Sequence, residues 1–210
     1  MDQAKTFKGL HVSSFESRRA DDMRHMIEKF DGHACVAASM REVPTHNHSE
    51  LSELANELLT GQIETVIVLT GVGFKHLMAA VEKIVDRERF IATLRDITTI
   101  ARGPKPVVAM KEFGITPTYR VHEPNTWREL LQVVDTELSV SNQKVAIQEY
   151  GQPNPSLIAG LEARGARVRS VQVYRWDFPE EIGPMDAALK RLAAGEQDVT
   201  LFTSAHQVTN

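Results

Sequence analysis

The chain has 210 residues, of which 42% are hydrophobic and 25% are charged, and its formal net charge is −4. This composition excludes a disordered chain, and no apolar run reaches the roughly 18 residues that a membrane-spanning helix needs. The small negative charge argues against a protein that binds nucleic acid over its whole surface, and the N-terminus lacks the apolar core of a signal peptide. We therefore expect a cytoplasmic protein with no membrane or nucleic-acid partner.

Short apolar runs alternate with amphipathic segments along the chain. The runs predict strands at 10–14, 34–38, 65–69, 98–101, 118–122, 144–148, 167–174 and 199–202. Helical spacing of apolar residues predicts helices at 23–30, 51–59, 74–85, 87–94, 127–134, 155–163 and 185–192, with a further helix that ends at Glu112. Strands and helices that alternate in this way are typical of βαβ units in a mostly parallel sheet.

Parts of the sequence repeat at a separation of 133 positions. At this separation the apolar run that ends in Thr70 matches the run that ends in Thr203. Residues 11–14 match 144–147, and residues 32–36 match 165–169. The repeat predicts a duplicated α/β unit, with a ligand bound where the copies face each other. The second copy has only seven residues after Thr203, so we expect two or three of its helices and two of its strands to be missing.

The turns that follow the predicted strands form the candidate site, because ligands of parallel sheets bind beyond the carboxyl ends of the strands. These turns are rich in Gly, Ser, Thr and Pro, and each leads into a helix whose first amides are unpaired. Such amides suit carboxylate or phosphate groups without a dedicated basic side chain. The turns are 13–14, 70–73, 101–105, 123–126, 148–151 and 203–205.

Several segments, in their order and spacing, together resemble the uroporphyrinogen-III synthase family. They are the repeated strand-and-turn pattern, Phe202-Thr203-Ser204-Ala205, the turn 101–105, the strand end 173–175 and the helix start 123–126. The resemblance extends from Gly9 to Asn210. The sequence departs from the family at 70–73, where many members have Thr-Ser and then a small residue or Asn, and it lacks the last part of the second copy.

The resemblance implies an α/β fold of two flavodoxin-like or Rossmann-like parallel-sheet lobes, joined by an extended linker of two segments. In this family the lobes do not coincide with the sequence copies. One lobe would comprise about 1–39 with 173–210, and the other about 44–168. The linkers would lie at about 40–43 and 168–174, and the first lobe would be incomplete with a thin core.

The resemblance also implies a reaction. The family closes the linear tetrapyrrole hydroxymethylbilane into uroporphyrinogen III, with inversion of ring D and loss of water, and uses neither cofactor nor metal. Hydroxymethylbilane synthase would then be the upstream enzyme. Because the substrate cyclises unaided to the wrong isomer, the enzyme would act mainly by folding it into the productive pose.

Two kinds of site residue follow from this resemblance. Groups that suit the eight substrate carboxylates are expected at Ser13, Thr70, Gly71, Gly73, Arg102, Gly103, Lys105, Thr126, Thr203, Ser204 and Ala205. Tyr174 is the candidate catalytic residue, which would assist departure of the hydroxyl group as a hydrogen-bond donor or weak acid.

The candidate residues also have structural interpretations. Thr70 and Thr203 suit helix N-caps, whether or not they bind a ligand as well. Arg102 and Lys105 suit solvated loop charges, and Tyr174 suits an aromatic strand end that packs on the linker.

Other features of the sequence have a structural interpretation that outweighs a functional one. Gly71 and Gly73 are only a fragment of a dinucleotide fingerprint. His46 and His48 favour a surface loop over a metal site, and Cys35 favours the core over a nucleophile. Arg18-Arg19 at a helix start opposes the helix dipole, which only slightly favours a functional or interlobe pairing.

A function of another class stays open. The same fold, with altered turns, suits a non-catalytic module that senses a polyanion or a tetrapyrrole and signals through an attached regulatory domain. The Gly-rich turn at 70–73 raises this alternative, although no pair of DNA-binding helices is visible. A flavodoxin-like response module is disfavoured, because no acidic cluster follows the first strand.

Overall fold

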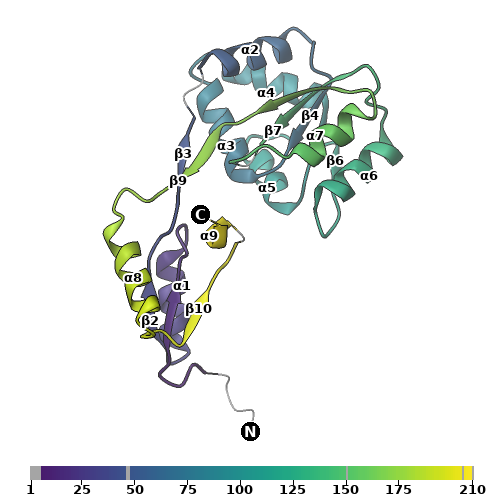
Figure 1. Cartoon of the computed structure of the whole chain (residues 1–210). Helices are drawn as coiled ribbons and strands as arrows, with labels where there is room; N and C mark the ends of the chain where they lie inside the picture. The colour runs from purple at the N-terminus through teal and green to yellow at the C-terminus, as the bar shows by residue number, and fades with distance from the viewer. Residues whose placement is uncertain (1–5, 46–47, 150, 205, 210) are drawn as a thin grey trace. The chain divides into compact units, whose positions relative to one another are not determined.

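The computed structural model describes residues 6–45, 48–149, 151–204 and 206–209. Contacts within the chain divide it into two compact units, Met1–Val43 with Trp176–Asn210 and Pro44–Arg175. Each unit has its own parallel sheet with helices packed on it (Figure 1). The mixed α/β fold with parallel sheets that the sequence predicts is therefore confirmed.

The larger unit contains a five-stranded parallel sheet in the order β6-β5-β4-β7-β8. Its strands are β4 (Thr65–Val68), β5 (Thr98–Ala101), β6 (Tyr119–Arg120), β7 (Lys144–Gln148) and β8 (Arg167–Val171). Its helices are α2 (His48–Leu59), α3 (Gly71–Val81), α4 (Arg87–Asp96), α5 (Pro104–Glu112), α6 (Trp127–Glu137) and α7 (Pro155–Glu162). β4 and β7 are buried along most of their length, as expected for strands covered on both faces.

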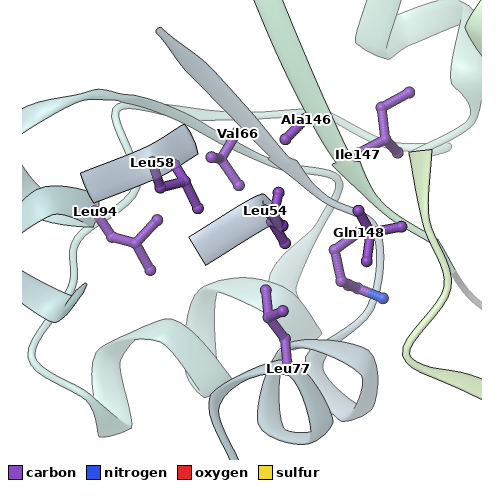
Figure 2. A pocket seen from close by; sticks show the side chains of 9 residues that line it. Leu54, Leu58, Val66, Leu77, Leu94, Ala146, Ile147 and Gln148 are labelled. Carbon is purple, nitrogen blue, oxygen red and sulfur yellow. The ribbon is translucent and has the colours of Figure 1, made fainter. Parts of the chain in front are cut away.

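Helices cover both faces of this sheet (Figure 1). On one face, Ile67, Ile100 and Ile147 pack in a core with apolar side chains of α6 and α7. On the other face, Val66 and Ala146 lie among leucines of α2, α3 and α4 (Figure 2). Because successive strand residues point to opposite faces, this double burial explains why β4 and β7 are runs of apolar residues rather than alternating ones.

The smaller unit contains a three-stranded parallel sheet in the order β10-β1-β2. The strands are β1 (His11–Ser14), β2 (His33–Val36) and β10 (Val199–Leu201), and the helices are α1 (Ala20–Lys29), α8 (Gly183–Ala193) and α9 (His206–Thr209). A small core cluster joins Phe15, Ala37 and Ala188. Of the apolar residues at helical spacing in the predicted helix 23–30, Ile27 is buried, whereas Met26 and Phe30 are 48% and 41% exposed.

The repeat in the sequence corresponds to a repeat of strand order. β1 lies between β10 and β2, and β7, its counterpart 133 positions later, lies between β4 and β8. β10 and β4 are the matched runs that end before Thr203 and Thr70. β10 comes from the second copy and pairs with β1 of the first, and β4 comes from the first copy and pairs with β7 of the second. The third strand of each three-stranded set is therefore exchanged between the two copies.

The chain passes between the units in β3 (Arg41–Pro44) and β9 (Tyr174–Asp177), which pair as a two-stranded sheet. The predicted long strand at 167–174 is wrong, because the chain forms β8 and β9 with Gln172 and Val173 between them. Most of the segment expected as the second linker, 168–174, belongs to β8, which pairs with β7 through Val171.

Two further elements, α3 and β6, also differ from the prediction in their bounds. Helix α3 begins at Gly71 rather than near Phe74, because Thr70 caps it. Strand β6 is two residues long rather than five.

Across the described residues, no helix combines the length and the apolar character that crossing a bilayer requires.

Candidate functional site

The parallel sheet of the larger unit brings three of the predicted turns to one edge. Thr70 follows β4, residues 102–105 follow β5 and residues 123–126 follow β6. Backbone bonds join neighbouring turns: Arg102 N–H donates to the Val68 carbonyl at 3.0 Å, and Val121 N–H donates to the Ala101 carbonyl at 2.9 Å. One edge of this sheet therefore carries the candidate residues Thr70, Gly71, Gly73, Arg102, Gly103, Lys105 and Thr126.

The side chain of Asn125 holds two of these turns together. In the orientation that satisfies both ends of its amide, its NH₂ group donates to the carbonyls of Arg102 and Val121 at 3.1 and 2.9 Å. Gly103 is buried beside it, and a Cβ at Gly103 would lie 3.0 Å from a terminal atom of the Asn125 amide. Gly103 is thus a packing position as well as the N-cap of α5.

The two glycines of the first turn allow close approach of the chain. A Cβ at Gly71 would lie 2.6 Å from the carbonyl oxygen of Lys105, and one at Gly73 would lie 1.9 Å from the Gln148 Nε2 atom. The Gln148 Oε1 atom accepts from the Thr70 N–H at 3.2 Å, and the Thr70 hydroxyl accepts from the Gly73 N–H at 3.0 Å. These glycines are required by packing, which explains them without a dinucleotide.

Among these helix starts, α3 offers the best amide donors to an anion. Thr70 caps the Gly73 N–H, which leaves the amides of Gly71 and Val72 as the donors of that turn. Helix α5 begins Pro104-Lys105-Pro106, so Lys105 carries the one N–H group among these three residues. The side chain of Lys105 is exposed, and that of Arg102 is partly exposed at the same edge.

The start of α6 is closed by the chain itself. Thr126 and Glu129 form a capping box, in which the Glu129 carboxylate accepts from the Thr126 N–H at 2.9 Å and from the Thr126 hydroxyl. These bonds, of which the hydroxyl bond is the largest effect, lower the pKa of Glu129. A carboxylate already occupies this helix start, so Thr126 serves as a cap here.

A carboxyl group that the sequence analysis did not single out lies at the same edge. Glu149 directly follows β7 and is fully buried. Burial raises its pKa, and the bonds from the Asn154 N–H at 3.3 Å and the Ser170 hydroxyl at 3.0 Å, together with the charge of Arg102, oppose the increase only in part. The sequence signal that could have drawn attention to it is the polar pair Gln148-Glu149 at the end of an apolar run.

The candidate catalytic residue, Tyr174, begins β9 and is 1% exposed. Its ring lies 5.7 Å from the ring of His76 on α3. Tyr174 is therefore packed beside the helix whose first turn offers the amide donors, although its ring contact is with the second turn of that helix rather than with the first.

The remaining candidates belong to the smaller unit. Ser13 is fully buried within β1, and its hydroxyl contacts β10 at the Val199 carbonyl (3.3 Å) and the Thr200 hydroxyl (3.0 Å). The structure therefore does not bring Ser13 to the carboxyl edge of its sheet. Thr203 and Ser204 follow β10 and are exposed. Ala205 lies outside the described residues.

Glu16 organises the carboxyl edge of the smaller sheet. It accepts from the backbone N–H groups of Arg18 and Arg19 at 3.0 and 3.2 Å and from the Thr203 hydroxyl. Partial burial favours the neutral form of Glu16, but these bonds and one from Gln207 outweigh it and lower its pKa. A carboxylate of the chain thus sits where the sequence predicts a ligand carboxylate.

Two further features lie near the candidate residues. In the smaller unit, Arg18 lies over the Trp176 ring, 5.1 Å from its centroid, and pairs with Glu42 beside a groove of about 480 Å³. In the larger unit, a cavity of about 10 Å³ lies among leucines with Gln148 at its polar end (Figure 2). That cavity holds at most about one water molecule, so it is a packing void.

The structure also places the His and Cys residues for which the sequence favours a structural interpretation. His48 starts α2 and is exposed, and His46 lies outside the described residues. Within the described ranges, no three His, Cys, Asp or Glu side chains gather as a metal site would require. Cys35 is partly buried on β2 and packs against the small core cluster.

Comparison with known proteins identifies the family. A family model described as uroporphyrinogen-III synthase HemD matches residues 21–210. The chain belongs to the uroporphyrinogen-III synthase family. It is 30% identical over 207 residues to "Uncharacterized protein YjjA" of Bacillus subtilis, which covers 97% of this chain and 74% of the relative. It is 29% identical over 196 residues to a Methanothermobacter thermautotrophicus protein named "Putative uroporphyrinogen-III synthase", covering 91% and 72%.

The fold agrees with the family. A crystal structure of a mutant uroporphyrinogen III synthase from the extremely thermophilic bacterium Thermus thermophilus is similar with a TM-score of 0.74 and 25% identity. The similarity covers 96% of this chain and 75% of that one. Membership in the family supports a role in tetrapyrrole biosynthesis and action on a small-molecule tetrapyrrole.

The packing around Gly73 leads to a first prediction. Gly73→Ala should lower the free energy of unfolding by about 1–3 kcal/mol, because the added Cβ displaces the Gln148 amide and breaks its bond to Thr70. Urea unfolding measures the change. Gly183→Ala is the matched control, since a Cβ there meets nothing within 4 Å, and it should be neutral or slightly stabilising. Equal stabilities for the two variants would contradict the packing role.

The raised pKa of Glu149 leads to a second prediction. The neutral carboxyl is favoured by folding, so its contribution to stability is complete below the ordinary carboxyl pKa and is lost as pH rises through the raised pKa. The stability of Glu149→Gln relative to wild type should therefore increase from pH 4.5 to pH 8, by about 1.4 kcal/mol for every pH unit between the folded and unfolded pKa. Urea unfolding across this range measures it, with the exposed Glu162→Gln as control. Parallel curves for wild type and Glu149→Gln would contradict the prediction.

Proposed function

We propose that this protein is a uroporphyrinogen-III synthase, which closes hydroxymethylbilane with inversion of ring D and loss of water in haem biosynthesis. The observation that carries the proposal is the shared edge of the larger sheet, in a chain that belongs to this family. At this edge the amides of Gly71 and Val72 and the cations Arg102 and Lys105 lie on adjacent turns. A polycarboxylate is the ligand that such donors suit.

The chemistry asks more for orientation than for an activated group. The substrate loses its hydroxyl and cyclises without help, so the protein has to select which carbon of ring D attacks. Fixed contacts to the acetate and propionate groups would fold the chain of pyrroles and lower the entropic barrier of the inverted closure. Arg102 and Lys105 would bind carboxylates by charge-assisted bonds, and the turn of α3 by its amides.

In the smaller unit, Thr203 and Ser204 are the residues proposed to bind carboxylate groups. In the structure, the Glu16 carboxylate accepts hydrogen bonds from the Thr203 hydroxyl and from the backbone N–H of Arg18, just before α1. A substrate carboxylate that binds there would replace or approach the Glu16 carboxylate, which makes this edge a weaker anion site than the edge at α3. We therefore assign the main carboxylate contacts to the larger unit.

The activity gives a third prediction. Supplied with hydroxymethylbilane generated in situ by hydroxymethylbilane synthase, the chain should produce the type III isomer in excess over type I. Chromatography of the oxidised uroporphyrins measures the isomer ratio, with an enzyme-free reaction as the control. An isomer ratio equal to that of the control would contradict the proposal and favour the non-catalytic binding module.

Tyr174 gives a fourth prediction. If its hydroxyl assists departure of the leaving group, Tyr174→Phe should lower kcat about 10- to 100-fold, within the range of general acid catalysis, with little change in KM. Tyr119→Phe is the matched control, because its hydroxyl donates at 3.2 Å to the Glu137 carbonyl on the surface and should not affect turnover. Circular dichroism and urea unfolding check that both variants fold. Unchanged kcat in folded Tyr174→Phe would remove this residue from the mechanism.

A further inference from the structure

A purely structural role for Glu149 does not explain the surroundings of one of its two carboxyl oxygens. Its Oε1 atom accepts from the Asn154 N–H and the Ser170 hydroxyl, and these bonds tie the turn before α7 to β8. Its Oε2 atom is buried and has no hydrogen-bond partner among the residues that the structure describes. A glutamine would make the two structural bonds equally well, so they do not account for a carboxyl group here.

Glu149 lies at the ligand-binding edge rather than elsewhere in the core. It directly follows Gln148, whose amide accepts from Thr70 and donates to the Glu149 carbonyl. Its position after β7 is next to the turn after β4, because these strands are adjacent and parallel. The same edge carries the amide donors of α3.

One charged group acts on Glu149 among the described residues. From β8 it faces the neutral Ser170, and from the turn before α7 it faces the neutral Asn154. From the turn after β5, the positive charge of Arg102 favours the ionised carboxylate. Burial favours the neutral acid and is the largest effect, whereas the Asn154 and Ser170 hydrogen bonds and then the charge of Arg102 favour the anion.

A carboxylate-rich ligand would change this balance in one direction. Its carboxylate would neutralise Arg102 and bring a further negative charge to the edge. Both effects disfavour a second, buried anion nearby, since like charges in a region of low dielectric repel strongly. We propose that Glu149 is a proton-linked binding residue, which takes up a proton when a polycarboxylate binds beside Arg102. This inference rests on the proposed binding of such a ligand at this edge.

The consequence is a specific pH dependence of binding. A site that takes up one proton binds its ligand up to about tenfold more tightly for each pH unit of acidification. The protonated form can be imitated by an amide of the same shape, so Glu149→Gln should bind the ligand well at every pH and lose this part of the dependence. Titration of the ligand's own carboxyl groups affects both proteins equally.

The experiment uses uroporphyrin III, a stable octacarboxylate, as the probe. Isothermal titration calorimetry at pH 6, 7 and 8, in buffers of different ionisation enthalpy, gives the Kd and the number of protons taken up. Wild type should take up more protons than Glu149→Gln, and its Kd should fall more steeply towards pH 6, by up to about tenfold per pH unit. Glu162→Gln, which removes an exposed carboxylate at the end of α7, should behave as wild type.

The outcomes separate this inference from the proposed activity. Equal proton uptake and equal pH dependence in wild type and Glu149→Gln would overturn it, as would a wild-type protein that binds no uroporphyrin. If Glu149→Gln does not fold, proton uptake by wild type and Glu162→Gln decides, and a count of zero overturns the inference. Proton-linked binding together with an isomer ratio equal to that of the enzyme-free reaction would retain the inference and reject the synthase activity.

Discussion

A hydrogen bond of 3.2 Å from the Thr70 N–H to the Gln148 side chain joins β4 and β7 where these strands end. It fixes the residue that caps α3, and so the direction in which the first amides of that helix point. The missing side chain of Gly73 makes room for the Gln148 amide. The other end of that amide donates to the Glu149 carbonyl, so the same side chain connects the proposed anion-binding turn with the residue that carries the buried carboxyl.

Competition between the chain and its ligand for the same donors distinguishes the helix starts. Glu129 occupies the start of α6, and Glu16 occupies the amides before α1 together with the Thr203 hydroxyl. A bound anion there has to displace a carboxylate that is already well placed, which costs free energy. At α3 the capping group is a neutral threonine, so a ligand can add its charge without displacing one.

Much of the fold could be predicted from local patterns. The apolar run at β7 and its polar boundaries predicted Lys144 to Gln148 correctly, and the helix after the proline and lysine turn was predicted correctly to end at Glu112. The strand at 167–174 was wrong because β propensity continues through Gln172 and Val173, whereas the pairing with β7 ends at Val171. Met26 and Phe30 likewise keep the helical spacing of apolar residues, but in the smaller unit both are exposed.

The candidate site could be predicted only in part. The turns after β4, β5 and β6 were identified because parallel strands end at one edge, and this part required only the order of strands and helices. Ser13 was predicted as a site residue near a strand end, but the sequence alone does not show that its hydroxyl contacts a neighbouring strand. Glu149 lies in the predicted turn 148–151 but was not singled out, because the polar pair Gln148-Glu149 at the end of an apolar run indicates the turn and not the burial of the carboxyl.

The sequence by itself determined the class of fold, the repeat and the turns that carry Gly, Thr and cations, since these depend on periodicity and on the backbone preferences of nearby residues. Tertiary structure decided which copy supplies each strand, which helix starts keep free donors and which carboxyl is buried. These depend on contacts between segments far apart in the chain, such as Thr70 with Gln148 and Glu16 with Thr203. Local propensity carries no information about such contacts, because their free energy arises only when the strands are paired.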